Sequence, residues 1–369
     1  MIDIDKITPG YKTVRNVESI EYTGQGGAKF QDHDVLFARI TPCLENGKVA
    51  IADMDGKNGI GSTELFVFRG IEGVTDTDYI YYLLRMKHIR QFAANSMTGA
   101  SGRQRADLDF IKRIQWDFPK IEVQKHIAEI LSAFDNLIEI NNKRIKVLEQ
   151  MAENLYKEWF VRFRFPGHET VKFENGFPTT WKRAKIADLA TFQNGFAFKS
   201  EDYDEKGRYV VVTIKNVQDG YFDLDSIERI DFLPSRMPKY CMLKKGDVIM
   251  SLTGNVGRVC IVSADSCLLN QRVCRIESKY PLFAYMFFKQ EAVFQLLCNI
   301  AYGTAQLNLS PILAGRMKTV LPPDDLMAQF NNKVSGLFSA IQQYREQNDN
   351  LIRQRDMLLP RLMSGKLEV

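Results

Sequence analysis

Basic side chains gather in one short part of the chain, where they could bind phosphate. Residues 85–113 contain seven Lys or Arg and two Asp, which by subtraction gives a local net charge of +5. Inside this stretch, residues 98–105 read Thr-Gly-Ala-Ser-Gly-Arg-Gln-Arg. Small residues of this kind let backbone N–H groups and arginines approach a phosphate closely. The stretch predicts a phosphate-contacting surface. A solvated helix face is the alternative, and the charge count does not separate the two.

Residue patterns typical of catalysis are missing from the sequence. It has no Gly-x-x-x-x-Gly-Lys-[Ser/Thr] motif, and no Gly-x-Gly-x-x-Gly motif opens a strand–helix unit. No serine, cysteine or histidine has a recognisable nucleophile setting, and the four histidines form no His-Glu-x-x-His pattern. The six cysteines form no Cys-x-x-Cys pair, so we interpret them as buried free thiols. The sequence predicts a recognition or scaffolding protein that is not an enzyme and holds no metal.

Length and composition set broad limits on the protein. A chain of 369 residues is long enough for two or three domains. No run approaches the ~20 apolar residues that a membrane span needs. The first residues, Met1-Ile-Asp-Ile-Asp-Lys6, lack the basic and apolar regions of a signal peptide, which predicts a cytoplasmic protein. The total net charge of +4 is too small to decide for or against nucleic acid.

Two long helical segments with apolar seams organise the chain. Residues 120–165 contain no proline or glycine, and apolar residues recur there at heptad spacing. A helix over residues 124–160 is roughly 55 Å long, so its seam needs a partner. The partner is a second seam near the C-terminus, in which each position lies 203 residues after its counterpart. The first seam is Ile127, Leu131, Phe134, Ile138, Asn141, Ile145, Leu148, Ala152, Leu155 and Trp159, and the second is Phe330, Val334, Leu337, Ile341, Tyr344, Asn348, Leu351, Arg355, Leu358 and Leu362.

Polar residues interrupt both seams at Asn141, Tyr344, Asn348 and Arg355. Buried polar groups in a seam fix the register and the choice of partner at a cost in stability. The alternative is that the helices splay at these positions and the polar groups meet solvent. The sequence leaves both interpretations open.

Each long helix follows a small head that contains strands and a helix, in the same order. In the first head we predict strands over 34–40, 47–52 and 64–69 and a helix over 78–94. In the second we predict strands over 209–214, 245–251, 254–262 and 271–276 and a helix over 282–297. The predicted fold is α+β, with two small mixed α/β domains separated by two long antiparallel helices in a coiled coil, and a pseudo-two-fold internal repeat. The predicted ranges are 1–119 for the first head, 120–164 for the central helix, 165–322 for the second head and 323–369 for the C-terminal helix.

Several phrases, in this order along the repeat, carry a family resemblance. They are Asp34-Val-Leu-Phe-Ala-Arg-Ile-Thr-Pro-Cys-Leu-Glu-Asn-Gly-Lys48, Asn154-Leu-Tyr-Lys-Glu-Trp-Phe-Val-Arg-Phe163, Phe177-Pro-Thr-Thr-Trp181, Gly303-Thr-Ala-Gln-Leu-Asn-Leu309 and Leu358-Leu-Pro-Arg-Leu-Met-Ser-Gly-Lys-Leu367. Over nearly its whole length the chain resembles the specificity (S) subunits of type I restriction-modification systems.

The resemblance implies two target-recognition domains, each of which reads one half of a split, asymmetric site in double-stranded DNA. It implies that the long helices act as a spacer and as the docking surface for two methyltransferase (M) subunits, which restriction (R) subunits join. S-adenosylmethionine, ATP and magnesium are expected on those partners, and no cofactor on this chain. The alternatives are a coiled-coil adaptor without DNA specificity, a truncated S fragment that works only with another S chain, and an orphan DNA-binding regulator.

The first head departs from the family pattern. Asp247 lies 66 positions after Trp181 in the second head, whereas only 33 residues precede Asp34 and no Phe-Pro-x-x-Trp phrase opens the first head. We therefore expect the first head to lack its N-terminal strands.

Candidate DNA-reading residues are the polar and basic side chains in turns beside the predicted strands, because Arg, Asn and Gln read base edges bidentately. In the first head these are Arg39, Asn46, Lys48, Ser101, Arg103, Gln104 and Arg105. In the second they are Lys199, Lys215, Asn216, Thr253, Asn255, Arg258, Asn270, Arg272, Tyr302, Thr304 and Gln306. For docking of M subunits we predict the outward helix faces together with Trp159, Phe160, Leu358 and Leu359. The alternative for these apolar residues is that they only close the coiled coil.

Overall fold

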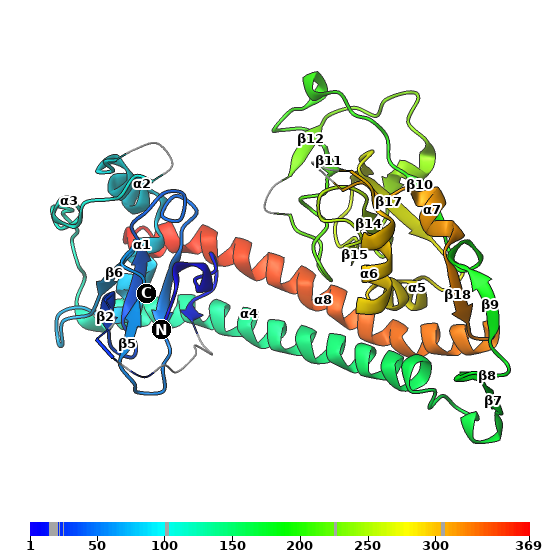
Figure 1. Ribbon diagram of the computed structural model, residues 1–369. Helices are drawn as coiled ribbons and strands as arrows, with labels where there is room; N and C mark the ends of the chain where they lie inside the picture. Colours follow the sequence, from blue (N-terminus) through cyan, green and yellow to red (C-terminus); the bar gives the residue numbers. More distant parts are fainter. Residues whose placement is uncertain (15–20, 22, 25, 100–102, 225–226, 304–306) are drawn as a thin grey trace. The chain divides into compact units, whose positions relative to one another are not determined.

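The computed structural model describes residues 1–369 except 15–20, 22, 25, 100–102, 225–226 and 304–306 (Figure 1). The chain divides into two compact units. The first unit combines Met1–Lys143 with Gln347–Val369, and the second is Arg144–Glu346. None of the helices in the described part of the chain combines the length and the apolar character needed to cross a bilayer.

The sheet of the first unit has the strand order β1-β4-β3-β6. Strand β3 is antiparallel to both β4 and β6, and β1 is parallel to β4. Both β3 and β4 are buried at every position, as their unbroken apolar sequences Val-Leu-Phe-Ala and Val-Ala-Ile-Ala require. A separate ribbon pairs β2 with β5. The bounds are β1 Thr13–Val14, β2 Ala28–Phe30, β3 Val35–Ala38, β4 Val49–Ala52, β5 Gly59–Gly61 and β6 Leu65–Phe68.

The helices of the first unit are α1 (Thr77–Arg85), α2 (Lys87–Asn95) and α3 (Leu108–Ile111). The single helix predicted over 78–94 is therefore wrong, because Met86 has extended backbone angles (φ −62°, ψ 133°) and separates α1 from α2. Helix α1 begins where the Asp76 side chain accepts a hydrogen bond from the Tyr79 N–H. It then covers the sheet with buried tyrosines and leucines.

The second unit contains two four-stranded sheets, with the orders β10-β17-β14-β15 and β12-β11-β16-β13. Ribbons pair β9 with β18 and β7 with β8. The bounds are β7 Phe173–Glu174, β8 Phe177–Pro178, β9 Lys182–Lys185, β10 Thr191–Asn194, β11 Tyr209–Val212, β12 Glu228–Ile230, β13 Met242–Leu243, β14 Val248–Ser251, β15 Val259–Ile261, β16 Cys267–Leu269, β17 Val273–Glu277 and β18 Lys318–Leu321. Short 3-10 turns are η1 Ile4–Lys6 in the first unit and η3 His168–Thr170, η4 Ile186–Asp188, η5 Ser200–Asp202 and η6 Lys239–Cys241 in the second.

The helices of the second unit repeat those of the first. They are α5 (Pro281–Phe288), α6 (Glu291–Ile300) and α7 (Pro311–Arg316). The single helix predicted over 282–297 is also wrong, since Gln290 has extended angles (φ −67°, ψ 132°), 204 positions after Met86. Strands β14, β15 and β17 stand in the same neighbour order as β3, β4 and β6. The two units therefore share these elements in the same order, which confirms the predicted internal repeat.

The two long helices are α4 (Ile121–Tyr156) and α8 (Asp324–Met363). In the first unit the Asn141 amide donates to Gln347 Oε1 (2.9 Å) and Asn348 Oδ1 (3.0 Å). In the second unit Arg345 pairs with Glu149 at 2.9 Å. In the first unit Asp135 also contacts Arg355, and in the second the Tyr156 and Phe330 ring centroids lie 5.7 Å apart. Rising numbers on α4 meet falling numbers on α8 in each unit, so the predicted antiparallel pairing is confirmed. The α-helical part of α4 ends earlier than predicted, because residues Lys157–Val161 form a π-helical segment, η2.

Most polar seam positions are buried. Asn141, Asn348 and Arg355 are 0%, 7% and 1% exposed, which excludes splaying at these three positions. Tyr344 is half-buried, with the Arg144 guanidinium 5.4 Å from its ring centroid. The seam therefore carries matched polar groups in place of leucines.

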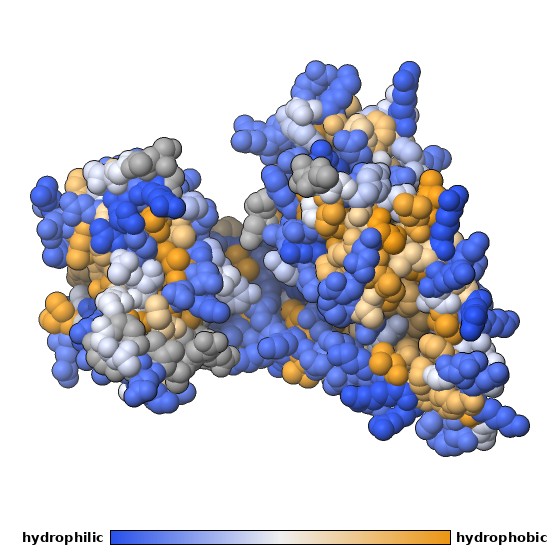
Figure 2. Space-filling model, viewed as in Figure 1, coloured by the Kyte–Doolittle hydropathy of each residue, from blue (hydrophilic) through white to orange (hydrophobic). Residues whose placement is uncertain are grey.

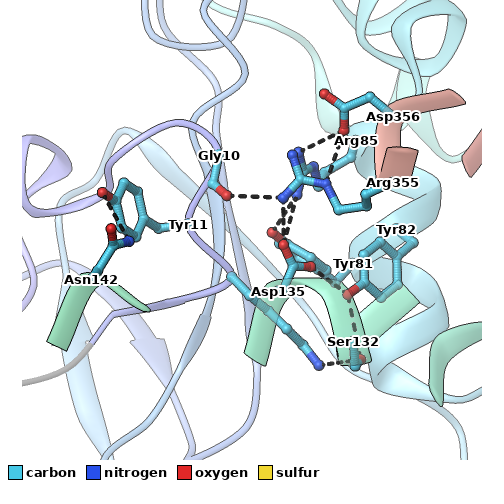
Figure 3. Close-up of polar contacts among 11 residues, drawn as sticks. Gly10, Tyr11, Tyr81, Tyr82, Arg85, Ser132, Asp135, Asn142, Arg355 and Asp356 are labelled. Atoms are coloured by element: carbon cyan, nitrogen blue, oxygen red, sulfur yellow. Dashed lines mark hydrogen bonds and ion pairs between the residues drawn. The ribbon is translucent and has the colours of Figure 1, made fainter. Parts of the chain in front are cut away.

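A buried polar network joins α4, α8 and α1 in the first unit (Figure 3). The Arg355 guanidinium donates to the Asp135 carboxylate, and Tyr82 OH donates to the other oxygen of that carboxylate at 2.5 Å. Burial alone would lower the pKa of Arg355, but the neighbouring carboxylates of Asp135 and Asp356 raise it overall. Burial, followed by the charge of Asp135, raises the pKa of Tyr82. Arg355 is thus held charged inside the helix pair.

The N-terminal segment is tied to the same network. Arg355 donates to the Gly10 carbonyl at 3.3 Å. Lys12 Nζ donates to Ser132 Oγ at 2.7 Å and to Asp78 at 2.9 Å. These contacts hold the segment that leads into β1 against α4.

The cysteines are free thiols, as predicted, although Cys43 and Cys298 are only partly buried. Burial raises the pKa of Cys260, Cys267 and Cys274 to about 12.

Candidate nucleic-acid interface

Three segments of the first unit meet at one end of β3. The Arg39 N–H donates to the Glu64 carbonyl at 2.9 Å, and the Ala106 N–H donates to the Arg39 carbonyl at 2.8 Å. These bonds join the end of β3 to the turn before β6 and to the loop after α2. The same loop forms isolated bridges from Arg105 to Thr98 and to Ile40.

We call these three hydrogen-bonded segments a backbone frame. The second unit builds the same frame with different side chains. The Leu252 N–H donates to the Arg272 carbonyl at 2.9 Å, and the Leu309 N–H donates to the Leu252 carbonyl at 2.8 Å. Asn308 forms the bridges that Arg105 forms in the first unit, here to Tyr302 and Thr253. One scaffold therefore presents Glu64 in the first unit and Arg272 in the second. Such an arrangement suits a surface whose backbone is fixed and whose side chains set specificity.

Two arginines of the first frame are already engaged. Arg105 binds Glu64 in a fork, with Nε–Oε2 and Nη2–Oε1 distances of 2.8 and 2.6 Å. The hydrogen bond to Glu64 raises the pKa of Arg105, and the same bond lowers the pKa of Glu64. The Arg39 guanidinium lies 4.6 Å from the Phe66 ring centroid and donates to the Ala106 carbonyl. Neither charge is presented freely to a ligand.

Arg103 is exposed in this loop and forms no ion pair with a described residue. Asn46 is exposed in the turn between β3 and β4, whereas Lys48 donates to the Ile4 carbonyl at 2.8 Å. Gln104 is half-buried, and its N–H donates to Thr41 Oγ1. Ser101 lies outside the described residues. Arg103 and Asn46 are the predicted residues most available for DNA in this unit.

In the second frame, Arg272 and Asn255 are exposed, and Arg272 forms no ion pair among the described residues. Arg258 is half-buried and donates to Gln218 Oε1 at 2.8 Å. Tyr302 is 57% exposed in the bridged loop, where its OH accepts from Asn308 Nδ2 at 3.5 Å. Thr304 and Gln306 of that loop lie outside the described residues.

Other candidates of the second unit have partners within the domain or, in the case of Thr253, a buried hydroxyl inside the frame. Lys199 pairs with Glu201 (3.1 Å) and Lys215 approaches Glu228 (3.8 Å). Asn270 donates to Tyr203 OH at 3.5 Å. The hydroxyl of Thr253 is buried and has no hydrogen-bond partner among the described residues.

Asn216 does not belong with the candidate surface. Its side chain is 0% exposed, accepts from the Thr213 N–H and donates to the Asp223 carbonyl. It stabilises a turn, which is a common role of Asn that the sequence does not distinguish from base reading.

The basic stretch 85–113 is not one continuous surface. The side chain of Arg85 is 12% exposed and joins the buried network through Asp135, 3.8 Å away. Arg90 is half-buried and donates to the Glu45 carbonyl. Lys112 pairs with Asp109 at 2.9 Å. The exposed basic side chains of this stretch that have no ion pair among the described residues are Lys87, Arg103 and Arg113.

The apolar residues chosen for docking are mostly internal. Trp159, Phe160 and Leu359 are each 7% exposed, and Leu358 is half-buried. Their contacts fit the alternative that they close the helix pair. Exposed apolar residues that sequence reasoning missed lie on α4, where Val147 and Met151 are 59% and 51% exposed one turn apart. The second unit has another apolar surface on α6 and α7 (Figure 2), where Leu296, Ile312 and Leu313 are exposed.

The repeated frames match a known family. A family model described as type I restriction modification DNA specificity domain matches residues 5–150 and again residues 178–322. The chain belongs to this family. Each match contains one of the two frames, and together the matches cover most of the chain.

Curated relatives are similar to this chain over most or all of its length. The MjaIX specificity subunit of Methanocaldococcus jannaschii is 27% identical over 402 residues, covering 100% of this chain and 87% of the relative. The MjaVIII specificity subunit of the same organism is 26% identical over 333 residues, covering 85% and 76%. The HindI specificity subunit of Haemophilus influenzae is 20% identical, covering 96% and 90%. All three are named as type I restriction enzyme specificity subunits.

A solved structure has the same fold. The S subunit of a type I restriction-modification system from M. genitalium aligns with a TM-score of 0.53 at 17% identity, covering 98% of this chain and 91% of that one. At this identity the likeness shows the fold alone.

Proposed function

We propose that each unit reads one half of a split, asymmetric DNA site, and that the chain supplies sequence specificity to a type I restriction-modification complex without performing catalysis. The observation that carries the proposal is the repeated backbone frame with unlike side chains. A shared frame would place both units on DNA in the same way, while Glu64 and Arg272 would make the two half-sites different. Residues 1–119 and 165–322 are the proposed target-recognition domains.

Within the frames, Arg103 and Arg272 are the proposed base or phosphate contacts, because both are exposed and neither is neutralised by a described carboxylate. An arginine that donates to O6 and N7 of guanine discriminates against other bases by about 1–3 kcal/mol. An arginine on a phosphate would instead add affinity on every sequence and increase the salt dependence.

Partner subunits supply the chemistry in this proposal. Two M subunits would bind S-adenosylmethionine and methylate adenine, and R subunits would add ATP- and magnesium-dependent cleavage, all acting on DNA in the cytoplasm. We place one M-subunit contact on the outward face of α4, where Val147 and Met151 expose apolar surface without a described partner element.

The test uses the chain assembled with its M subunits and a duplex that contains the methylated motif. Arg103→Ala and Arg272→Ala should each weaken binding about tenfold, the equivalent of ~1.4 kcal/mol. The matched controls are Lys57→Ala in the first unit and Arg236→Ala in the second, both exposed and neither part of a frame. Each arginine should relax one half of the motif. Unchanged affinity for both variants would reject the frames as reading surfaces, and no DNA binding by the native assembly would favour the adaptor.

A further inference from the structure

A ribbon of two strands in the second unit carries positive charge on one face (Figure 1). Strand β9 pairs with β18 so that Lys185 lies opposite Lys318 and Arg183 opposite Val320, which places these four side chains on the same face. The other face includes Leu321, which is 7% exposed and belongs to the core of this unit. Lys185, Lys318 and Arg183 are exposed, and none of them forms an ion pair with a described residue. The outer face of the ribbon therefore presents three cations to solvent.

The position of two of these cations disfavours the ribbon itself. Lys185 and Lys318 are directly opposite each other, and like charges at such paired positions are destabilising. The nearest carboxylate in sequence, that of Asp188, accepts a hydrogen bond from the Lys185 backbone N–H at 2.7 Å and forms no ion pair with either lysine. Folding alone does not account for this arrangement, whereas an anionic ligand would offset the repulsion.

A hollow of about 710 Å³ borders this face, and all of its lining belongs to the second unit. The lining includes the three cations and one carboxylate, that of Asp188, which by subtraction gives a net charge of +2. One wall is Phe177 on β8, which is 43% exposed and whose ring centroid lies 5.9 Å from that of Phe163. Phe173 on the paired strand β7 is 51% exposed and contacts the same ring. The hollow thus combines positive charge with exposed aromatic surface.

The hollow lies away from the backbone frame of this unit. Strand β10 follows shortly after Asp188, and its first residue, Thr191, pairs with Glu277 at the last position of β17. The frame lies at the other end of β17, where Arg272 directly precedes Val273. The two surfaces are therefore at opposite ends of one sheet. This placement favours an occupant other than the DNA segment that the frame contacts.

We propose that the hollow binds an extended acidic segment of a partner protein, in which Asp or Glu occupies alternate positions. Alternate residues of an extended chain lie about 6.6–6.8 Å apart on one face, and Arg183 and Lys185 are alternate residues of β9. The carboxylates of the segment pair with these two cations and with Lys318, and its apolar side chains cover Phe177. Arginine and aromatic residues together are typical of protein interfaces, whereas a phosphate backbone would leave the aromatic wall uncovered. This inference does not depend on DNA binding.

The probe is a fluorescent peptide in which Glu alternates with Leu and Thr, titrated into the full-length chain at low salt. Saturable 1:1 binding is expected. Lys318→Glu should weaken it at least about tenfold, because the change replaces an attraction with a repulsion. The same change creates an opposite-charge pair with Lys185, so the melting temperature should not fall. Lys206→Glu, at an exposed residue of the second unit that does not line the hollow, is the matched control and should leave the affinity unchanged.

Absence of saturable binding would overturn the proposal, and so would equal binding of a matched peptide with Gln in place of Glu. Titration with a random-sequence DNA duplex tests phosphate as the occupant, and a loss of about tenfold with Lys318→Glu would assign the hollow to DNA instead. Sedimentation of the native chain tests a second copy, and a concentration-dependent dimer that Lys318→Glu abolishes would overturn the assignment to a partner protein. A monomer with unchanged duplex binding supports the proposal. Loss of DNA reading in the Arg103 and Arg272 variants would leave all of these outcomes unchanged.

Discussion

Removal of the Arg355 side chain should destabilise the first unit strongly. Arg355→Ala leaves Asp135, whose side chain is 4% exposed, without its main cation. Truncating one partner of a buried ion pair costs about 3–5 kcal/mol. Arg85 lies 3.8 Å from Asp135 and Tyr82 still donates to it, so we expect the lower end, about 3 kcal/mol. That is a large part of the ~5–15 kcal/mol by which domains are stable.

A charge-free seam should recover most of this loss. The counterparts of Asp135 and Arg355 in the second unit are Phe338 and Ala152, and both are in its apolar core. We therefore consider a triple variant with Asp135→Leu, Arg355→Leu and Tyr82→Phe, the last of which removes a hydroxyl left without its acceptor. Its free energy of unfolding should be no more than about 1 kcal/mol below that of the native chain.

Urea denaturation followed by tryptophan fluorescence measures these changes. Trp116 is the tryptophan of the first unit, and the other two, Trp159 and Trp181, belong to the second. A background with both of the latter changed to Phe therefore reports the first unit. The control is Arg353→Ala, at an exposed residue two positions away on α8. Its free energy of unfolding should lie within about 0.5 kcal/mol of that of the native chain. The reasoning is refuted if Arg355→Ala costs less than about 1 kcal/mol, or if the triple variant loses as much as Arg355→Ala.

Four further predictions concern the surface. Glu64→Gln should release Arg105 for phosphate contact and steepen the slope of log affinity against log salt by about 0.9, and an unchanged slope would contradict this. Because the Arg105 hydrogen bond lowers the pKa of Glu64 below its usual 4.5, the stability it contributes is present above that pH and lost as pH falls through the lowered pKa. Glu64→Gln should remove that part of the acid dependence in a pH series of melts. Arg258→Ala should break the bond to Gln218 and weaken DNA binding less than Arg272→Ala does, and an equal or greater loss in parallel titrations would contradict the partial burial of its side chain. Met151→Glu should weaken capture of M subunits without changing the melting temperature, whereas the docking role proposed for this face of α4 fails if capture is unchanged.

The long helices were predictable because their signal is periodic and long. Heptad spacing over more than thirty residues is typical of a coiled-coil helix, and the 203-residue offset identified the partner seam. The polar seam positions were identified as well, but the sequence left open whether they are buried and did not indicate their partners. Asn141 meets Asn348, and Arg355 meets Asp135, because the helices run in opposite directions, so a residue does not face its own counterpart at the 203-residue offset.

The helix breaks and the state of the candidate arginines were not predictable from local sequence. Met86 and Gln290 are ordinary helix formers, so only packing of the two shorter helices accounts for their extended backbone. Glu64 lies 41 positions before Arg105, and the fold alone brings them together.

The most direct test of the central claim is a genome-wide map of methylated adenine in strains that carry the native gene, no gene, Arg103→Ala or Arg272→Ala. The account predicts a split, asymmetric motif that disappears on deletion, with one half relaxed by Arg103→Ala and the other half by Arg272→Ala. An unchanged map on deletion, or relaxation of the same half by both variants, would contradict the claim that each unit reads its own half of the site.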